Sequence, residues 1–123
     1  MTISCGTDII EINRIKESLD KYDEKFKQSV FTKNEIEYCE SHKTQKYQHY
    51  AARFAAKEAI FKAISKKINN EYNWTDFEIA NLENGKPEVS LNIKIPEVES
   101  IDISLSHCKE YAVATAVVLF KEE

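Results

Sequence analysis

The chain has 123 residues, 17 Lys+Arg against 21 Asp+Glu, a formal net charge of −4 and 42% hydrophobic residues. This length predicts one domain over residues 1–123 and is short for an enzyme that encloses a large cofactor alone, which favours an oligomer. The acidic balance argues against a nucleic-acid partner, and the hydrophobic content argues against disorder. The longest uncharged apolar run, residues 111–120, is about half of what crosses a bilayer, so no membrane partner is expected.

The N-terminus and the cysteines predict a cytoplasmic location. Residues 1–8 lack the positive start, apolar core and small-residue cleavage site of a secretory signal. Cys5, Cys39 and Cys108 are odd in number, far apart and without metal-finger spacing, which is typical of reduced thiols. A catalytic Cys108 beside His107 is a minor alternative, because neighbouring residues of a strand point to opposite faces.

The predicted elements begin with a strand and two helices. Residues 3–10 predict a short buried strand, and apolar residues at helical spacing predict a helix over residues 11–22. Thr32 and Glu35 fit a capping box, in which the N-cap and the third helical residue satisfy free backbone N–H groups. A short helix is therefore expected from there to about Ser41.

The central part of the chain is expected to form one long helix over residues 50–64. This stretch is rich in alanine and contains neither Gly nor Pro, so its helix propensity is high. Its many alanines allow another element to approach closely. The polar residues 41–48 before it are expected to form a loop or a helix start, and residues 65–75 after it are expected to form a loop.

The C-terminal half predicts antiparallel strands. Residues 77–80 alternate in polarity as a strand does, and residues 87–95 follow as the partner strand after the Asn-Gly pair at 84–85, which predicts a type I′ turn. Residues 101–105 and 111–120 predict two further strands. One strand, then helices including one long alanine-rich helix, then an antiparallel sheet make an α+β fold.

Two pairs of charged residues lie on the predicted long helix. Glu58 and Lys62 are four residues apart and share one face, and Arg53 and Lys57 make a second such pair on a nearby face. A surface salt bridge worth roughly a few tenths of a kcal/mol would explain the first pair. The small and aromatic neighbours leave this helix little polar face, however, which indicates the wall of a site.

Asp8 is a second candidate for chemistry. A carboxylate near the end of a buried strand is unfavourable unless it is paired or binds a metal, although it could also be the N-cap of the following helix. Asp8 with Glu58 would give an oxygen site suited to Mg²⁺, which takes one or two carboxylates and fills its other positions with water and phosphate oxygens. His107, just past a predicted strand, is a third candidate, with a structural role as its alternative.

Four short motifs resemble the 4′-phosphopantetheinyl transferases and their short bacterial branch. Residues 6–11, Gly-Thr-Asp-Ile-Ile-Glu, resemble the Gly-x-Asp signature. Residues 53–63, Arg-Phe-Ala-Ala-Lys-Glu-Ala-Ile-Phe-Lys-Ala, resemble the second signature, Phe/Trp-x-x-Lys-Glu-Ala-x-x-Lys. Residues 84–87 and 105–112 are similar to the short branch. The similarity covers about residues 3–119, and the two signatures together are specific, whereas either alone is weak.

The resemblance implies a reaction and a cofactor. The family transfers the 4′-phosphopantetheine arm of coenzyme A to a serine of an apo acyl carrier protein and releases adenosine 3′,5′-bisphosphate. Catalysis would rest on Asp8, Glu58 and Lys62. Asp8 and Glu58 would hold Mg²⁺, and Glu58, directly or through a metal-bound water, would take the proton of the serine. The residues expected to hold the phosphates of coenzyme A are Arg53, Lys57, Lys62 and His107.

The resemblance also implies partners. A homotrimer with active sites at the subunit interfaces is expected, because a chain of half the length of its two-part relatives must take its partner surface from another copy. The carrier protein is acidic, and the basic side chains expected to dock it are Arg14, Lys21 and Lys25. At residues 65–70 the family has a glycine-rich turn, whereas this chain has no glycine there.

Two other interpretations stay open. The chain could be a non-catalytic carrier- or nucleotide-binding module of the same fold. It could also be a small structural domain in which the Glu58–Lys62 pair is only a surface salt bridge. Purification as a monomer indifferent to coenzyme A would favour the structural domain.

Overall fold

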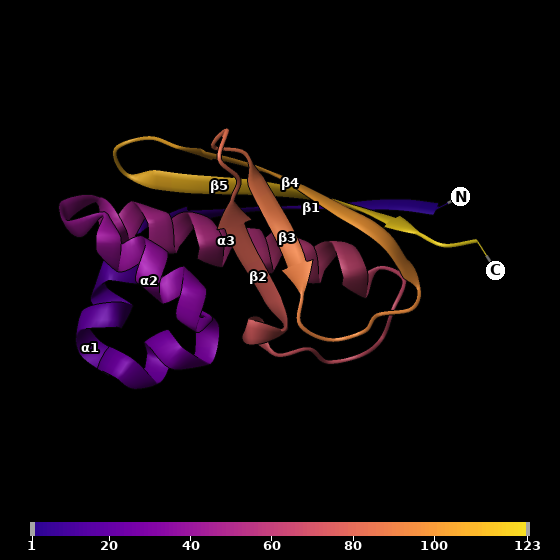
Figure 1. Cartoon of the computed structure of the whole chain (residues 1–123), viewed down its shortest axis with the longest axis horizontal. Coiled ribbons are helices and arrows are strands. Elements are labelled where there is room, and N and C mark those ends of the chain that lie inside the picture. Colours follow the sequence, from indigo (N-terminus) through magenta and orange to yellow (C-terminus); the bar gives the residue numbers. More distant parts are fainter. Residues whose placement is uncertain (1, 123) are drawn as a thin grey trace.

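The computed structural model describes residues 2–122, and of Asp23 it describes the backbone alone. The N-terminal half contains one strand and three helices, β1 (Thr2–Glu11), α1 (Ile12–Val30), α2 (Lys33–Ser41) and α3 (Lys46–Ser65). The C-terminal half contains the strands β2 (Phe77–Asn81), β3 (Pro87–Leu91), β4 (Val98–His107) and β5 (Tyr111–Phe120), and short 3₁₀ turns precede α3 and β2 (Figure 1). This order confirms the α+β prediction. None of the helices in the described part of the chain is long and apolar enough to cross a membrane.

The main sheet is antiparallel, with β5 in the centre between β1 and β4. β1 pairs with β5 along its whole length, so that Asp8 lies opposite Ala114, and Leu105 of β4 lies opposite Ala114 on the other side. Side chains of a strand alternate between the two faces, and α3 covers the face that carries the buried Ala114. Asp8 therefore points to the face that is covered by the helix carrying Glu58 and Lys62.

Close packing of β1 on α3 depends on Gly6. A Cβ atom at this position would lie 2.2 Å from the backbone oxygen of Ala59 and 3.0 Å from the backbone nitrogen of Ala63. Both alanines are fully buried. Their small side chains, together with the missing side chain of Gly6, let the strand and the helix backbones approach, as the alanine-rich sequence predicts.

The hairpin of β2 and β3 packs against a second side of α3 (Figure 1). Phe77 and Ile79 of β2 are buried in one hydrophobic cluster with Ala56 and Ile60 of α3. The helix thus has the main sheet on one side and the hairpin on another. A helix enclosed in this way is apolar almost all round, which explains why α3 has so little polar face.

Several bounds differ from the sequence prediction. α1 continues to Val30 instead of ending near residue 22, because Phe26 and the buried Val30 extend its apolar stripe. α3 begins at Lys46, so the undecided stretch before the predicted helix is partly helical. β3 ends at Leu91 rather than at residue 95, because Leu91 pairs with Phe77, the first residue of β2.

The predicted type I′ turn at residues 84–85 is wrong. That turn needs positive φ at both central residues, but among the described residues only Gly85, with φ 86°, and Lys43 have positive φ. Leu82 N–H donates to Lys86 O at 2.8 Å, and Gly85 N–H donates to Leu82 O at 2.8 Å. The loop therefore has three residues, with the glycine in the left-handed position that such hairpins use.

Candidate active site

Asp8, Glu58 and Lys62 come together where β1 crosses α3. Lys62 Nζ lies 3.2 Å from Asp8 Oδ1 and donates a hydrogen bond to the backbone oxygen of Thr7 at 3.0 Å. Glu58, one turn before Lys62, lines the same pocket as Asp8. The N-cap alternative for Asp8 is wrong, because Glu11 occupies the N-cap of α1. Lys62 therefore forms its ion pair with Asp8 of β1. This pair joins α3 to β1, whereas the Glu58–Lys62 salt bridge considered from the sequence would have joined two turns of the same helix.

A pocket of about 350 Å³ opens beside these residues, between β1, α1 and α3. Its polar side chains are two carboxylates, a guanidinium and a hydroxyl, set between aliphatic and aromatic walls. A concave site with a few convergent polar groups is typical of ligand binding. The lining residues are Asp8, Ile9, Ile10, Arg14, Ile15, Ser18, Phe26, Phe54 and Glu58.

The surroundings of Glu58 favour a positive partner. Burial raises the pKa of the Glu58 carboxyl, the charge of Asp8 raises it further, and Lys62 opposes both effects. Among the side chains that the structure describes, no group of three or more from His, Cys, Asp or Glu could hold a metal. Two carboxylates at an open pocket nevertheless fit Mg²⁺, which needs only one or two and leaves its other positions to water and phosphate oxygens.

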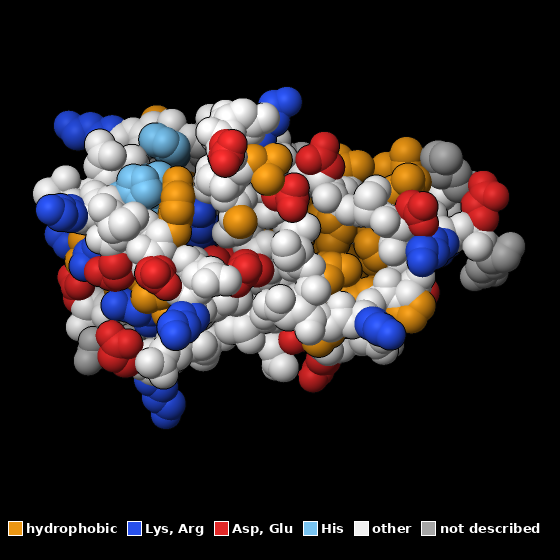
Figure 2. Space-filling model, viewed as in Figure 1, with side chains coloured by type: hydrophobic (Ala, Val, Ile, Leu, Met, Phe, Trp, Pro, Cys, Tyr) orange, Lys and Arg blue, Asp and Glu red, His pale blue; other side chains and the backbone are white. Residues whose placement is uncertain are grey.

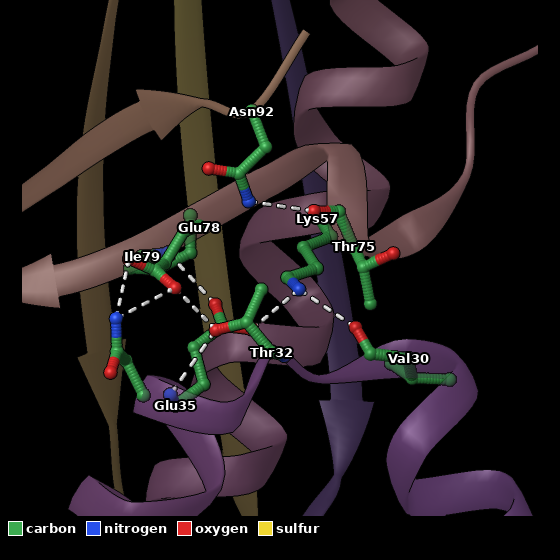
Figure 3. A network of polar contacts seen from close by, with 9 residues as sticks. Val30, Thr32, Glu35, Lys57, Thr75, Glu78, Ile79 and Asn92 are labelled. Carbon is green, nitrogen blue, oxygen red and sulfur yellow. Dashed lines mark hydrogen bonds and ion pairs between the residues drawn. The ribbon is translucent and has the colours of Figure 1, made fainter.

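Lys57 does not face this pocket. Its side chain is 0% exposed, and its ammonium lies 2.6 Å from Glu35 Oε1 and donates to Val30 O at 2.7 Å (Figure 3). Burial lowers the pKa of Lys57, while Glu35 raises it. In a single chain the enclosed ammonium offers no surface to a ligand, and the expected contact of Lys57 with a coenzyme A phosphate stays a prediction.

Arg53 lies in the same interior layer. Its side chain is nearly buried, Nη2 donates to Asn81 Oδ1 at 2.7 Å, and the guanidinium carbon lies 4.3 Å from the centre of the Tyr38 ring. Arg53 and Lys57 share a face of α3 that is rotated by about 100° from the face of Glu58. The structure thus separates the two charged pairs that the sequence places on neighbouring faces.

His107 lies at the edge of the sheet opposite to Asp8. It ends β4, and β5 lies between β4 and β1, so a single chain does not bring His107 to the pocket. Near it the rings of His42 and His49 lie 4.0 Å apart, and Figure 2 shows histidine side chains together on the surface. The pKa of His49 falls to about 4, first through burial and then through the charges of His42, Arg53 and His107. Sequence analysis missed this histidine cluster, because its members come from three different segments.

The predicted docking residues divide between the pocket and the surface. Arg14 lines the pocket with Asp8 and Glu58. Lys21 and Lys25 are exposed further along α1. The helix therefore carries positive charge both at the acidic pocket and away from it.

Sequence analysis noted the aromatic neighbours of Glu58 and Lys62 but missed Trp74, which packs on two of them. Phe54 stacks on Trp74 with ring centroids 4.9 Å apart, and Phe61 meets the same ring edge-on at 5.0 Å. Trp74 comes from the segment expected to be a loop. The available signal was the spacing of Phe54, Glu58 and Phe61, which lie three or four residues apart on one side of the helix.

Comparison with known proteins gives a family and its relatives. The model of the 4′-phosphopantetheinyl transferase superfamily matches residues 4–116. The holo-[acyl-carrier-protein] synthase of Ruminiclostridium cellulolyticum is 49% identical over 124 residues, covering 96% of this chain and 92% of that protein. The crystal structure of a Bacillus anthracis holo-(acyl-carrier-protein) synthase in complex with CoA (3′,5′-ADP) is 39% identical with a TM-score of 0.78, over 94% of both chains. The Helicobacter pylori holo-[acyl-carrier-protein] synthase in complex with coenzyme A is 29% identical with a TM-score of 0.82, over 94% of this chain and 99% of that one.

Proposed function

Because the chain belongs to the 4′-phosphopantetheinyl transferase superfamily, we propose that it transfers the 4′-phosphopantetheine arm of coenzyme A to a serine of an apo acyl carrier protein. The products are the holo carrier protein and adenosine 3′,5′-bisphosphate. The observation that carries this proposal is the pocket shared by Asp8 and Glu58, with Lys62 bound to Asp8. The coenzyme A complexes of two relatives support coenzyme A as the donor.

The reaction forms one P–O bond and breaks another. The serine oxygen attacks the phosphorus that carries the pantetheine arm, and the bond from this phosphorus to the bridging oxygen breaks, so adenosine 3′,5′-bisphosphate leaves with the electron pair. Glu58 takes the proton of the serine hydroxyl as a general base. Lys62, one turn along α3, stabilises the negative charge that develops on the leaving phosphate.

Mg²⁺ fits the acidic end of this pocket. Asp8 and Glu58 would hold the ion, which when bound neutralises charge on the pyrophosphate oxygens. The pKa of Glu58, raised by burial and by Asp8, supports this assignment, because a nearby cation stabilises both carboxylates in their charged form. Arg14 of α1 lines the same pocket and adds a fixed positive charge on the side where the carrier is proposed to dock.

The active assembly is a homotrimer with sites between neighbouring copies. The outer face of β1 and β5, away from α3, exposes Ile3 by 63%, Ile9 by 64%, Tyr111 by 43% and Val117 by 41%. A contiguous apolar sheet face of this kind is ordinarily covered by another surface, and we assign it to further copies of this chain. Such an arrangement could also bring the His107 of one copy to the pocket of the next.

The acidic carrier protein docks on the basic side chains of α1. Arg14 lies at the pocket, where a forked guanidinium could pair with a carboxylate next to the entering serine. Lys21 and Lys25 are four residues apart and exposed, so they extend this basic strip away from the pocket.

A transfer assay on the purified chain tests the proposal. With coenzyme A, Mg²⁺ and an apo acyl carrier protein, the chain is expected to add the mass of one phosphopantetheine arm to the carrier, and metal chelation should stop the reaction. Asp8→Asn and Glu58→Gln should each lower turnover by about 100-fold or more, because the phosphate clamp contributes several kcal/mol to the transition state. The exposed carboxylate variant Glu88→Gln is the control and should keep full turnover.

The possible outcomes separate the parts of the proposal. Near-normal turnover of either pocket variant would overturn the metal assignment. Binding of coenzyme A without any transfer would instead identify a non-catalytic binding module. Sedimentation as an active monomer at working concentration would overturn the trimer.

A further inference from the structure

One ion pair of this protein is fully enclosed. Lys57 and Glu35 have 0% exposed side chains, and Lys57 Nζ lies 2.6 Å from Glu35 Oε1. Lys57 also donates to Val30 O at 2.7 Å, while Glu35 accepts from the backbone N–H groups of Thr32 and Ile79, each at 2.8 Å (Figure 3). The pair therefore joins α3 to the end of α1, the start of α2 and strand β2. None of these contacts is needed by the proposed chemistry.

The two charges face the ends of two helices. Val30 is the last residue of α1, and Glu35 is the third helical residue of α2 in its capping box. The free carbonyls at a helix C-terminus carry partial negative charge, and the free N–H groups at an N-terminus carry partial positive charge. The ammonium of Lys57 and the carboxylate of Glu35 each lie at the end that attracts them. Together they hold the corner at residues 31–32, where α1 turns into α2.

The position of α1 matters for the pocket. Arg14, Ser18 and Phe26 of α1 line the pocket that Asp8 and Glu58 also line. α1 follows directly on β1, so its N-terminal end is held by the chain itself. Its C-terminal end is held by the Val30 contact with Lys57, by the buried side chain of Val30 and by the ion pair of Lys27 with Glu40 at 3.3 Å.

The length of α1 determines how far its pocket-lining residues move when its C-terminal end is displaced. The helix has 19 residues, and at 1.5 Å per residue it is about 28 Å long. If α1 pivots at its start, a shift of 1 Å at Val30 moves Phe26 by about 0.8 Å. The same pivot moves Arg14 by only about 0.1 Å, so the contact at Val30 acts on the Phe26 side of the pocket wall.

From this geometry we infer that Lys57, paired with Glu35, is a positioning residue: it anchors the C-terminal end of α1 through Val30 and so positions the Phe26 side of the pocket that Asp8 and Glu58 line. The inference rests on the proposed transferase function. It replaces a direct phosphate contact of Lys57 by an indirect role. Within one copy, the groups proposed to act on the phosphates of coenzyme A are Lys62 and the two carboxylates Asp8 and Glu58. The packing of β1 on α3 that places them does not involve the Lys57–Glu35 pair, so the affinity for coenzyme A should not depend on Lys57.

Two variants separate the possible roles of Lys57. Lys57→Met leaves the carboxylate of Glu35 buried without a partner and is expected to unfold more easily. The double variant Lys57→Met/Glu35→Gln removes both charges and keeps an oxygen for the Ile79 N–H, but its amide NH2 group faces the Thr32 N–H. Its melting temperature should therefore return part of the way from that of Lys57→Met towards that of the wild type. It still lacks the donor to Val30. The control Lys33→Met removes an exposed lysine of α2 and should leave every readout at the wild-type value.

Three measurements on the double variant test the inference. Hydrogen exchange at the amides of residues 26–30 should speed up at least tenfold while the amides of β5 exchange as in the wild type. Transfer, measured as kcat/KM for the carrier, should stay at least tenfold below the wild type. The Kd for coenzyme A should remain within about threefold, because a lost hydrogen bond to a charged phosphate would weaken binding by roughly tenfold or more.

Other results would overturn the inference. Recovery of transfer together with the melting temperature would assign the pair to stability alone, as would a double variant that cannot fold. A rise of the coenzyme A Kd in step with the loss of transfer would restore the phosphate contact. Hydrogen exchange tests the anchoring of α1 without the reaction, and transfer by the wild type tests the proposed function. A failure of one is therefore distinguished from a failure of the other.

Discussion

Replacing Gly6 by alanine tests the closest contact in the fold. The added Cβ would lie 2.2 Å from the backbone oxygen of Ala59 and 3.0 Å from the backbone nitrogen of Ala63. Both atoms belong to the backbone of α3, so no side-chain rotation can relieve the clash. β1 must therefore move away from α3 by about 1 Å, because real Cβ contacts lie near 3.4 Å or beyond. Asp8, two residues along β1, would move with it.

The expected loss of stability follows from the size of this clash. Overpacking of a well-packed site costs about 1–3 kcal/mol, and a backbone contact belongs at the upper end of that range. For 123 residues at about 2.1 cal/mol/K per residue, the entropy of unfolding is about 0.26 kcal/mol/K. A loss of about 3 kcal/mol then lowers the melting temperature by about 12 °C. A 1 Å shift of Asp8 should also lower turnover by about 100-fold.

Gly85→Ala provides a matched control, because Gly85 is the other glycine of this chain. An added Cβ there would meet no atom within 4 Å, but the residue has φ 86°. The left-handed conformation costs an alanine about 1–2 kcal/mol, so the melting temperature should fall by about 4–8 °C with turnover unchanged. Differential scanning calorimetry and the transfer assay measure both variants. A Gly6→Ala protein that melts within 3 °C of the wild type and keeps full turnover would refute the reasoning.

Two further predictions concern charge. Arg14→Glu should lower kcat/KM for the carrier by about 10- to 100-fold and leave the Kd for coenzyme A unchanged; loss of coenzyme A binding with an intact carrier KM would move Arg14 to the phosphate site. His49 has a folded pKa of about 4 against an ordinary 6.5, so the unfolded chain binds more protons between these values and stability falls as the pH decreases through that window. The full shift corresponds to about 3 kcal/mol, and solvent screening lowers it to about 1–2 kcal/mol. Urea unfolding measures the free energy of unfolding at pH 7 and at pH 4.5, and the difference between the two should be smaller in His49→Phe by about 1–2 kcal/mol. An equal difference in both proteins would contradict the assigned pKa shift of His49.

Only part of the grouping of Asp8, Glu58 and Lys62 could be predicted from local rules. A spacing of four residues puts Glu58 and Lys62 on one side of any α-helix. The expected buried strand is an edge strand with Ile3 and Ile9 exposed, and only its inner face, which carries Asp8, is covered by α3. The structure brings the three residues together at the crossing of β1 and α3, with the 3.2 Å ion pair between Lys62 and Asp8. Local spacing alone does not bring Asp8 to a helix 50 residues further along the chain; the combination of the two family signatures supplied that link.

The position of Lys57 could not be predicted in the same way. Spacing shows that Arg53 and Lys57 share a face, but it does not show what covers that face. The covering groups come from distant segments, namely the corner at Val30, the capping box with Glu35 and the strand that begins at Phe77. A charged pair on a helix therefore looks the same in sequence whether it faces solvent, a ligand or a buried partner.

The three sides of α3 explain how the pocket is assembled. One side carries the small side chains of Ala59 and Ala63, which pack against Gly6. It sets the distance of β1, and so of Asp8, from the helix. A second side, with Glu58, faces the pocket. A third carries Lys57, which reaches past the helix to hold the far end of α1. The pocket lies between β1 and α1, so its width depends on two contacts that lie outside it. Substitutions at those contacts should change transfer without removing any group that touches a substrate.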